Sequence, residues 1–159
     1  METLKKKYFL YTLPIYGFLG LIILVALIAP YLESRRLAAS EVFYLILRPL
    51  CHQMPTRCLW MFGSNTALCS RCMGIYIAIL LSGLYLGVKA PSRIYWKTPI
   101  VLILPVLIDG LSQYIGWRMS NNYLRFSTGL IAGTGAGMFF FPIYFRLVDG
   151  LTLNRRKKA

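Results

Sequence analysis

The side chains best suited to chemistry in this sequence are its four cysteines and its single histidine, and all of them lie between positions 51 and 72. Cys51 and His52 are adjacent, Cys58 follows, and Cys69 and Cys72 form a C-x-x-C pair. Thiolate sulfur and imidazole nitrogen are common ligands of zinc and copper in proteins. We therefore predict a transition-metal site, zinc first and copper second. The predicted ligands are Cys51, His52, Cys69 and Cys72.

The C-x-x-C pair stands at the predicted start of a helix, where residues three apart share one face. The helix dipole and Arg71, which lies between the two cysteines, both favour the thiolate form. A thiolate also attacks disulfides, so two alternatives stay open. One is a membrane thiol–disulfide oxidoreductase that uses Cys69 and Cys72, with Cys51 and Cys58 as a second dithiol. The other is a pair of structural disulfides. The sequence alone does not decide whether the protein is an enzyme.

A second group of polar residues lies in or beside the predicted membrane helices. Asp109 sits midway along one of them, where a carboxylate is costly unless it is paired, and Gln113 follows on the same face. We predict either an interhelical ion pair with an arginine or a functional role. As a functional residue, Asp109 would orient His52 or line the path of a small transporter. The residues predicted to support the site are Arg71, Asp109, Gln113, Arg118, Asn122 and Arg125.

The composition places these residues in a membrane protein. Of the 159 residues 57% are hydrophobic and only 14% are charged, which is unusual for a soluble domain of this size. The net charge of +13 does not indicate nucleic-acid binding, because the basic residues form short clusters between apolar runs. The bilayer is therefore the expected partner, and nucleic acid is not.

Four apolar runs are long enough to cross a hydrocarbon core, which takes about 20 helical residues. They cover about 8–30, 69–88, 99–117 and 126–147. A shorter apolar segment, 41–50, predicts an interfacial helix that ends before Pro49. The predicted fold is an all-α polytopic membrane protein, a single domain over 1–159, with four transmembrane helices and one short interfacial helix.

The basic residues set the predicted orientation in the cell membrane. With four crossings, both termini and the 89–97 connection lie on one side, which positive-inside identifies as the cytoplasm. The segment 51–72 then faces outward, and the basic tail 150–159 is cytoplasmic. All seven lysines fall on the cytoplasmic side: Lys5, Lys6, Lys7, Lys89, Lys97, Lys157 and Lys158.

Small residues repeat every four positions in the last apolar run, at Gly129, Gly133 and Gly137. Such spacing lets a second helix backbone approach closely. Packing within one bundle is the favoured interpretation, and a homodimer through these glycines is the alternative.

The chain resembles a family of predicted prokaryotic membrane proteins catalogued as domain of unknown function 2085. The resemblance covers roughly 45–137, and it implies a small multi-pass membrane protein without implying an activity. It rests first on the segments C-H-Q-x-P-x-R, from Cys51 to Arg57, and L-C-x-R-C-x-G-I-Y, from Leu68 to Tyr76. In the later runs it rests on Pro105, Asp109, Gly110, Gln113, Arg118, Ser120, Asn122, Arg125, Thr128 and Gly129.

Two residues depart from this family pattern. Cys58 stands where a serine-like residue is usual, and Met119 stands where an acidic residue is often found. The resemblance therefore implies a site of three thiols and one imidazole, which suits a metal better than two redox pairs, and it makes Cys58 a local feature of this chain.

Overall fold

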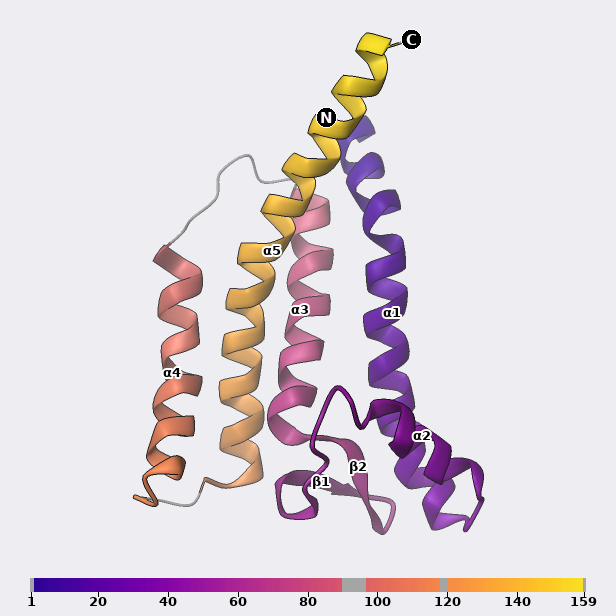
Figure 1. Ribbon diagram of the computed structural model, residues 1–159, viewed down its shortest axis with the longest axis vertical. Coiled ribbons are helices and arrows are strands. Elements are labelled where there is room, and N and C mark those ends of the chain that lie inside the picture. Colours follow the sequence, from indigo (N-terminus) through magenta and orange to yellow (C-terminus); the bar gives the residue numbers. More distant parts are fainter. Residues whose placement is uncertain (1, 90–96, 118–119, 159) are drawn as a thin grey trace.

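The computed structural model describes residues 2–89, 97–117 and 120–158, and its architecture is mostly helical (Figure 1). The long helices are α1 (Glu2–Ser34), α3 (Ser70–Lys89), α4 (Lys97–Tyr114) and α5 (Asn122–Lys158). Between α1 and α3 lie the short helix α2 (Ala39–Leu47), the 3-10 turn η1 (Pro55–Arg57) and the strands β1 (Cys58–Met61) and β2 (Ser64–Cys69). Helix α2 matches the predicted interfacial helix and ends before Pro49.

Three helical segments in the described part of the chain are long and apolar enough to cross a membrane: Tyr8–Ser34, Ser70–Lys89 and Asn122–Gly150. They coincide with three of the four predicted runs. The fourth run forms α4, which has only 18 residues and carries Lys97, Asp109 and Gln113. The helical character of this run is confirmed, and its crossing of the membrane stays a prediction.

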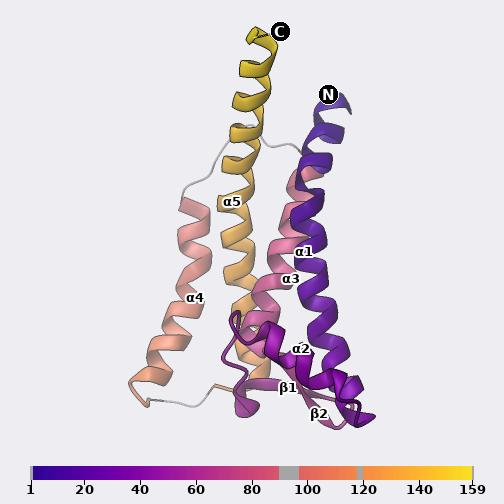
Figure 2. The ribbon, with the colours of Figure 1, turned by 45° about the vertical axis from the view of Figure 1, so that its right-hand side comes forward.

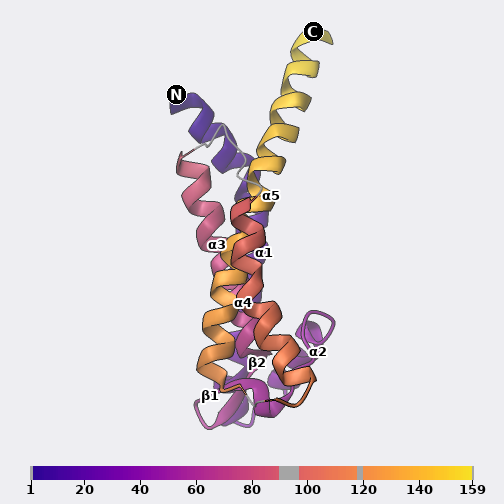
Figure 3. The same ribbon diagram turned by 90° about the vertical axis from the view of Figure 1, so that its left-hand side faces the viewer.

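The four long helices lie side by side, with α3 between α1 and α5 and with α4 against the other side of α5 (Figures 1 and 2). The start of α1 and the end of α5 lie at the same end of this bundle. Helix α2 and the two strands gather at the opposite end, which Figure 3 shows from the side of α4. We call this the cysteine end, because it holds residues 51–69.

The strands form an antiparallel hairpin that the all-helical prediction left out. Its turn is Phe62-Gly63, with φ of 53° and 84°, the left-handed conformation that two-residue hairpin turns require. Strand pairing places Cys58 opposite Cys69 and Trp60 opposite Asn65. The hairpin thus carries the chain from the loop that holds Cys51 directly into the first turn of α3.

Helices α3 and α5 touch through glycine. A Cβ at Gly133 would lie 2.5 Å from the Ile75 carbonyl oxygen, and one at Gly129 would lie 2.4 Å from that of Arg71. A Cβ at Gly137 would likewise overlap the Ser82 side chain. The favoured packing within one bundle is therefore found. The alternative homodimer through Gly129, Gly133 and Gly137 does not fit this fold, because α3 of the same chain covers those glycines.

An apolar cluster supports the cysteine end. It combines an isoleucine and two alanines of α1 with buried residues of α2, β2 and α3, and it includes Cys51, which is 5% exposed. Its members are Ile22, Ala26, Ala29, Leu47, Cys51, Ala67, Leu68 and Met73. Cys51 thus packs against this cluster, although it belongs to the loop after α2.

Candidate metal centre

Three cysteines from three elements converge at the cysteine end. Cys51 comes from the loop after α2, Cys69 is the last residue of β2, and Cys72 lies in the first turn of α3. Their sulfur atoms all lie within 4.8 Å of one another. Cys51 is buried and the other two are partly exposed, so the group borders both the core and the outside.

Local backbone contacts hold Cys51 in this position. Its N–H donates to the Leu47 carbonyl at 3.1 Å, which closes the end of α2. Its sulfur accepts a hydrogen bond of 3.2 Å from the N–H of Cys69. A backbone N–H directed at sulfur stabilises negative charge there, as it does around metal-bound thiolates.

Two side chains anchor the loop and the hairpin to α2. The Gln53 amide nitrogen donates to the Tyr44 carbonyl at 2.7 Å. The Tyr44 hydroxyl lies 2.5 Å from the Asn65 carbonyl oxygen in β2, to which it donates. Sequence reasoning did not identify these anchoring roles. The sequence pointed to one of these two residues, because Gln53 belongs to the C-H-Q segment.

The thiols that neighbour one another share their protons unequally. Hydrogen bonds donated by the thiols of Cys69 and Cys72 lower the pKa of Cys51, and they outweigh the opposing effect of burial. The same hydrogen bond to Cys51 raises the pKa of Cys69. Cys51 is therefore the thiol of this group that loses its proton most readily.

Cys58 lies outside this group although it pairs with Cys69 in the hairpin. Burial raises the pKa of the Cys58 thiol to about 12, and the nearby charges of Cys69 and Cys51 add to the effect. All four cysteines are free thiols. The alternative disulfides, Cys51–Cys58 and Cys69–Cys72, are thus not formed in this structure.

His52 is the predicted ligand that the structure does not bring into the group. Its side chain is exposed, and its nitrogens are not among the ligand atoms that gather within 4.8 Å. Adjacent residues send their side chains in different directions, so burial of the Cys51 thiol leaves the neighbouring imidazole outside. Three of the four predicted ligands therefore meet.

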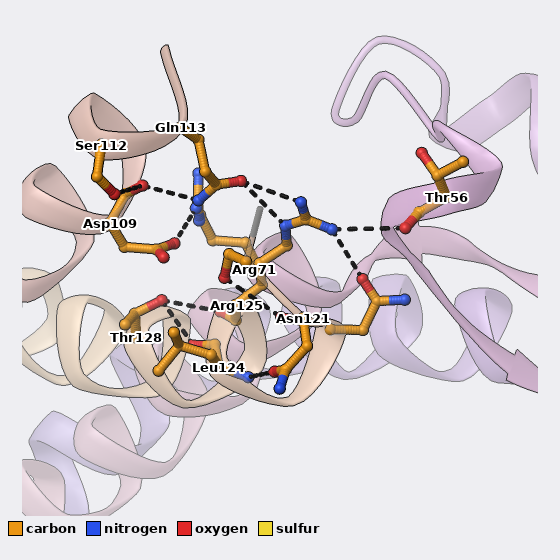
Figure 4. Close-up of polar contacts among 11 residues, drawn as sticks. Thr56, Arg71, Asp109, Ser112, Gln113, Asn121, Leu124, Arg125 and Thr128 are labelled. Carbon is orange, nitrogen blue, oxygen red and sulfur yellow. Dashed lines mark hydrogen bonds and ion pairs between the residues drawn. The ribbon is translucent and has the colours of Figure 1, made fainter. Parts of the chain in front are cut away.

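The predicted supporting residues form a polar network beside the thiols (Figure 4). Arg71, at the start of α3, makes an ion pair with Asp109 of α4, whose side chain is only 3% exposed. The interhelical Asp–Arg pair, one of the two roles foreseen for Asp109, is present. It fixes α4 against the turn of α3 that carries Cys72.

Arg125 connects the same network to the loop before the hairpin. Its guanidinium donates to the Gln113 side-chain oxygen at 3.0 Å, to the Asn122 side-chain oxygen at 3.0 Å and to the Thr56 carbonyl at 3.4 Å. The Asn122 amide in turn donates to the Cys58 carbonyl at 2.8 Å. Arg118 and Met119 lie outside the described residues.

Comparison with known proteins identifies a protein family whose match covers this region. The model of a family described as "Predicted membrane protein (DUF2085)" matches residues 51–139, more than half of the chain. This region begins at Cys51 and contains the three grouped cysteines and the polar network.

Two archaeal relatives are similar to the chain. An uncharacterized protein of Methanocaldococcus jannaschii, MJ1492, is 36% identical over 116 residues, which cover 69% of this chain and 72% of the relative. An uncharacterized protein of Methanothermobacter thermautotrophicus is 42% identical over 91 residues, which cover 55% of this chain and 81% of the relative. No solved structure matches the chain significantly.

Proposed function

The chain belongs to the DUF2085 family of predicted membrane proteins, and we propose that it holds a transition-metal ion on three thiolates, from Cys51, Cys69 and Cys72. Zinc is the first choice and copper the second, as the ligand chemistry predicts. The ion sits at the cysteine end of a multi-pass helical bundle, where it is handled from the outer side of the membrane.

The convergence of three sulfurs carries this proposal. In a tetrahedral zinc site with Zn–S bonds of about 2.3 Å, neighbouring sulfurs are about 3.8 Å apart. The three thiols lie within 4.8 Å of one another, so a contraction of at most about 1 Å between sulfurs seats the ion. A redox dithiol needs only two sulfurs. Convergence of a third therefore favours a metal over the oxidoreductase, which uses Cys69 and Cys72 alone.

We assign the fourth ligand position to His52. The residue follows Cys51 directly and is exposed, so the loop must turn its imidazole toward the thiols for it to bind the ion. A closed shell of four buried ligands is typical of structural zinc. One exposed ligand that swings in and out instead suits exchange, and this favours metal handling over a purely structural role.

We further propose that α4 crosses the membrane as the fourth span. It lies beside α5, and the start of α1 and the end of α5 share one end of the bundle (Figure 1), as four crossings require. Lysine clusters lie near both ends of the sequence, at 5–7 and 157–158, and therefore belong to that shared end. Positive-inside then makes it cytoplasmic and turns the cysteine end outward. A transporter path along Asp109 gains no support, because Asp109 is buried and paired with Arg71.

Metal analysis of the purified protein tests this function. We expect one zinc or copper ion per chain in the wild type, and binding weakened more than about 100-fold in Cys72→Ala, since a lost ligand costs at least as much as a lost supporting residue. Cys58→Ala is the matched control, because it removes a buried thiol outside the group. Metal-free wild type, or equal losses in the two variants, would refute the site.

A further inference from the structure

We propose that Arg71 and Arg125 form a binding site for a phosphate-type oxyanion at the cysteine end of the bundle. This site is separate from the thiols and does not depend on a bound metal. The evidence is the unpartnered Nε–H of Arg71 and the buried positive charge of Arg125.

Arg71 has a donor without a partner. One of its terminal nitrogens is taken by the Asp109 carboxylate. Its Nε–H, however, is buried and has no hydrogen-bond partner. Leaving a buried donor unsatisfied costs about 1–3 kcal/mol, more for a charged group. An acceptor that binds between the helices would remove this cost.

Arg125 carries a buried charge, and the hydrogen-bond partners of its guanidinium among the described residues are all neutral. The residue is only 5% exposed. It donates to the side-chain oxygens of Gln113 and Asn122 and to the Thr56 carbonyl. Buried guanidiniums are normally paired with a negative group. Carbonyl dipoles orient this guanidinium without neutralising it.

The local charges of the described residues do not balance. Asp109 is the carboxylate that acts on Arg125, and it is already in contact with Arg71. Arg57, which is exposed, and Arg71 both repel the charge of Arg125, and the Cys69 thiol is the other group that attracts it. One carboxylate thus faces the two guanidiniums of Arg71 and Arg125, and an excess of positive charge remains between α4, α5 and the hairpin.

The geometry of the two arginines suits one shared ligand. Asp109, which holds Arg71, and Gln113, which holds Arg125, lie on successive turns of α4, where the Gln113 amide also donates to the Asp109 carbonyl at 2.7 Å. Figure 4 shows the Arg125 guanidinium at the Gln113 side chain and the Arg71 guanidinium at the neighbouring Asp109 carboxylate. Guanidinium groups recognise phosphate by charge and by directed N–H donors. The site lies at the cysteine end of the proposed membrane helices, close to the expected lipid headgroups. The phosphate can therefore come from a phospholipid headgroup or from free phosphate.

Two measurements on the purified full chain, made with and without bound metal, test this site. Thermal unfolding is followed in inorganic phosphate and in chloride at equal ionic strength, and native mass spectrometry reports retained phospholipid. We expect binding by the wild type and about tenfold weaker binding by Arg71→Lys, which keeps the positive charge beside Asp109 but lacks the Nε–H. Arg48→Lys is the matched control, because Arg48 is exposed.

The outcomes separate the two sources. Stabilisation by phosphate of lipid-free protein, reduced in Arg71→Lys only, supports a free oxyanion. A phospholipid retained by the wild type and by Arg48→Lys, but lost from Arg71→Lys, supports a lipid headgroup. Wild type that retains no phospholipid and responds equally to phosphate and chloride overturns the proposal, and this comparison needs no variant to fold. Because apo protein is measured in parallel, failure of the metal centre would not be mistaken for failure of this site.

Discussion

The fold brings three of the four cysteine sulfurs together, those of Cys51, Cys69 and Cys72. The sulfur of Cys58 lies outside this group. Sequence types and spacing were enough to single out the segment 51–72, and the family resemblance set Cys58 apart. The outward direction of His52 was not readable from the sequence, because it depends on the loop that ends α2 and on the burial of the neighbouring Cys51.

His52→Ala tests the assignment of the fourth ligand. We expect the variant to retain the ion on three thiolates and to bind it about 10- to 100-fold more weakly, an effect similar to that of losing a supporting residue. Competition with a chromophoric zinc chelator measures this affinity. Exposed Arg48→Ala serves as the control. An unchanged affinity in His52→Ala would remove the imidazole from the site.

Proton release on metal binding tests the charge distribution among the thiols. The pKa of Cys51 is lowered by the hydrogen bonds from Cys69 and Cys72, so we expect this thiol to have lost its proton before the metal binds. The raised pKa of Cys69 means that this thiol must lose its proton to the ion. Metal affinity should therefore fall as the pH falls, with fewer than three protons released per ion near neutral pH. Calorimetry in buffers of different ionisation enthalpy counts them, and a count of three would be the contrary result.

The helices were predictable because lipid imposes their length and apolar character, whereas the hairpin was not. Its strands have four and six residues, and they show no clean alternation of buried and exposed positions. The turn is Phe62-Gly63 and not the Asn-Gly or Asp-Gly pair that marks such turns most strongly. The pairing of Cys58 with Cys69 therefore had no local signal.

Gly133→Ala tests the close contact of α3 and α5 that sets Cys72 beside the hairpin. The added methyl group would lie 2.5 Å from the Ile75 carbonyl oxygen. We expect a loss of about 1–3 kcal/mol in the free energy of unfolding, since backbone atoms must shift to admit it. Gly20→Ala is the control, because a Cβ there meets nothing within 4 Å. Equal stability of the two variants would mean that the helices do not pack this way.

At the scale of the whole molecule, the bundle separates a lysine-rich end from the cysteine end. Sequence reasoning predicted this separation from the lysine clusters and the apolar runs. The polar network that links α3, α4 and α5 was predicted only as a set of residues. Its pairs, Arg71 with Asp109 and Arg125 with Gln113, follow from helix packing that the sequence does not encode locally.

The orientation is testable in whole cells. A green fluorescent protein fused after Ala159 should fluoresce, because it folds in the cytoplasm, and a protease site inserted in the Phe62-Gly63 turn should be cut from outside. Four crossings with a cytoplasmic N-terminus predict both results. A dark fusion, or cleavage of the inserted site only after the cells are lysed, would reverse the orientation and place the metal centre inside.

X-ray absorption at the edge of the bound metal tests the centre most directly. For zinc, the account predicts three sulfur ligands at about 2.3 Å and one nitrogen ligand at about 2.0–2.1 Å. A shell of nitrogen and oxygen alone would contradict it. So would a shell of four sulfurs, which would require Cys58 to leave its buried position in the hairpin.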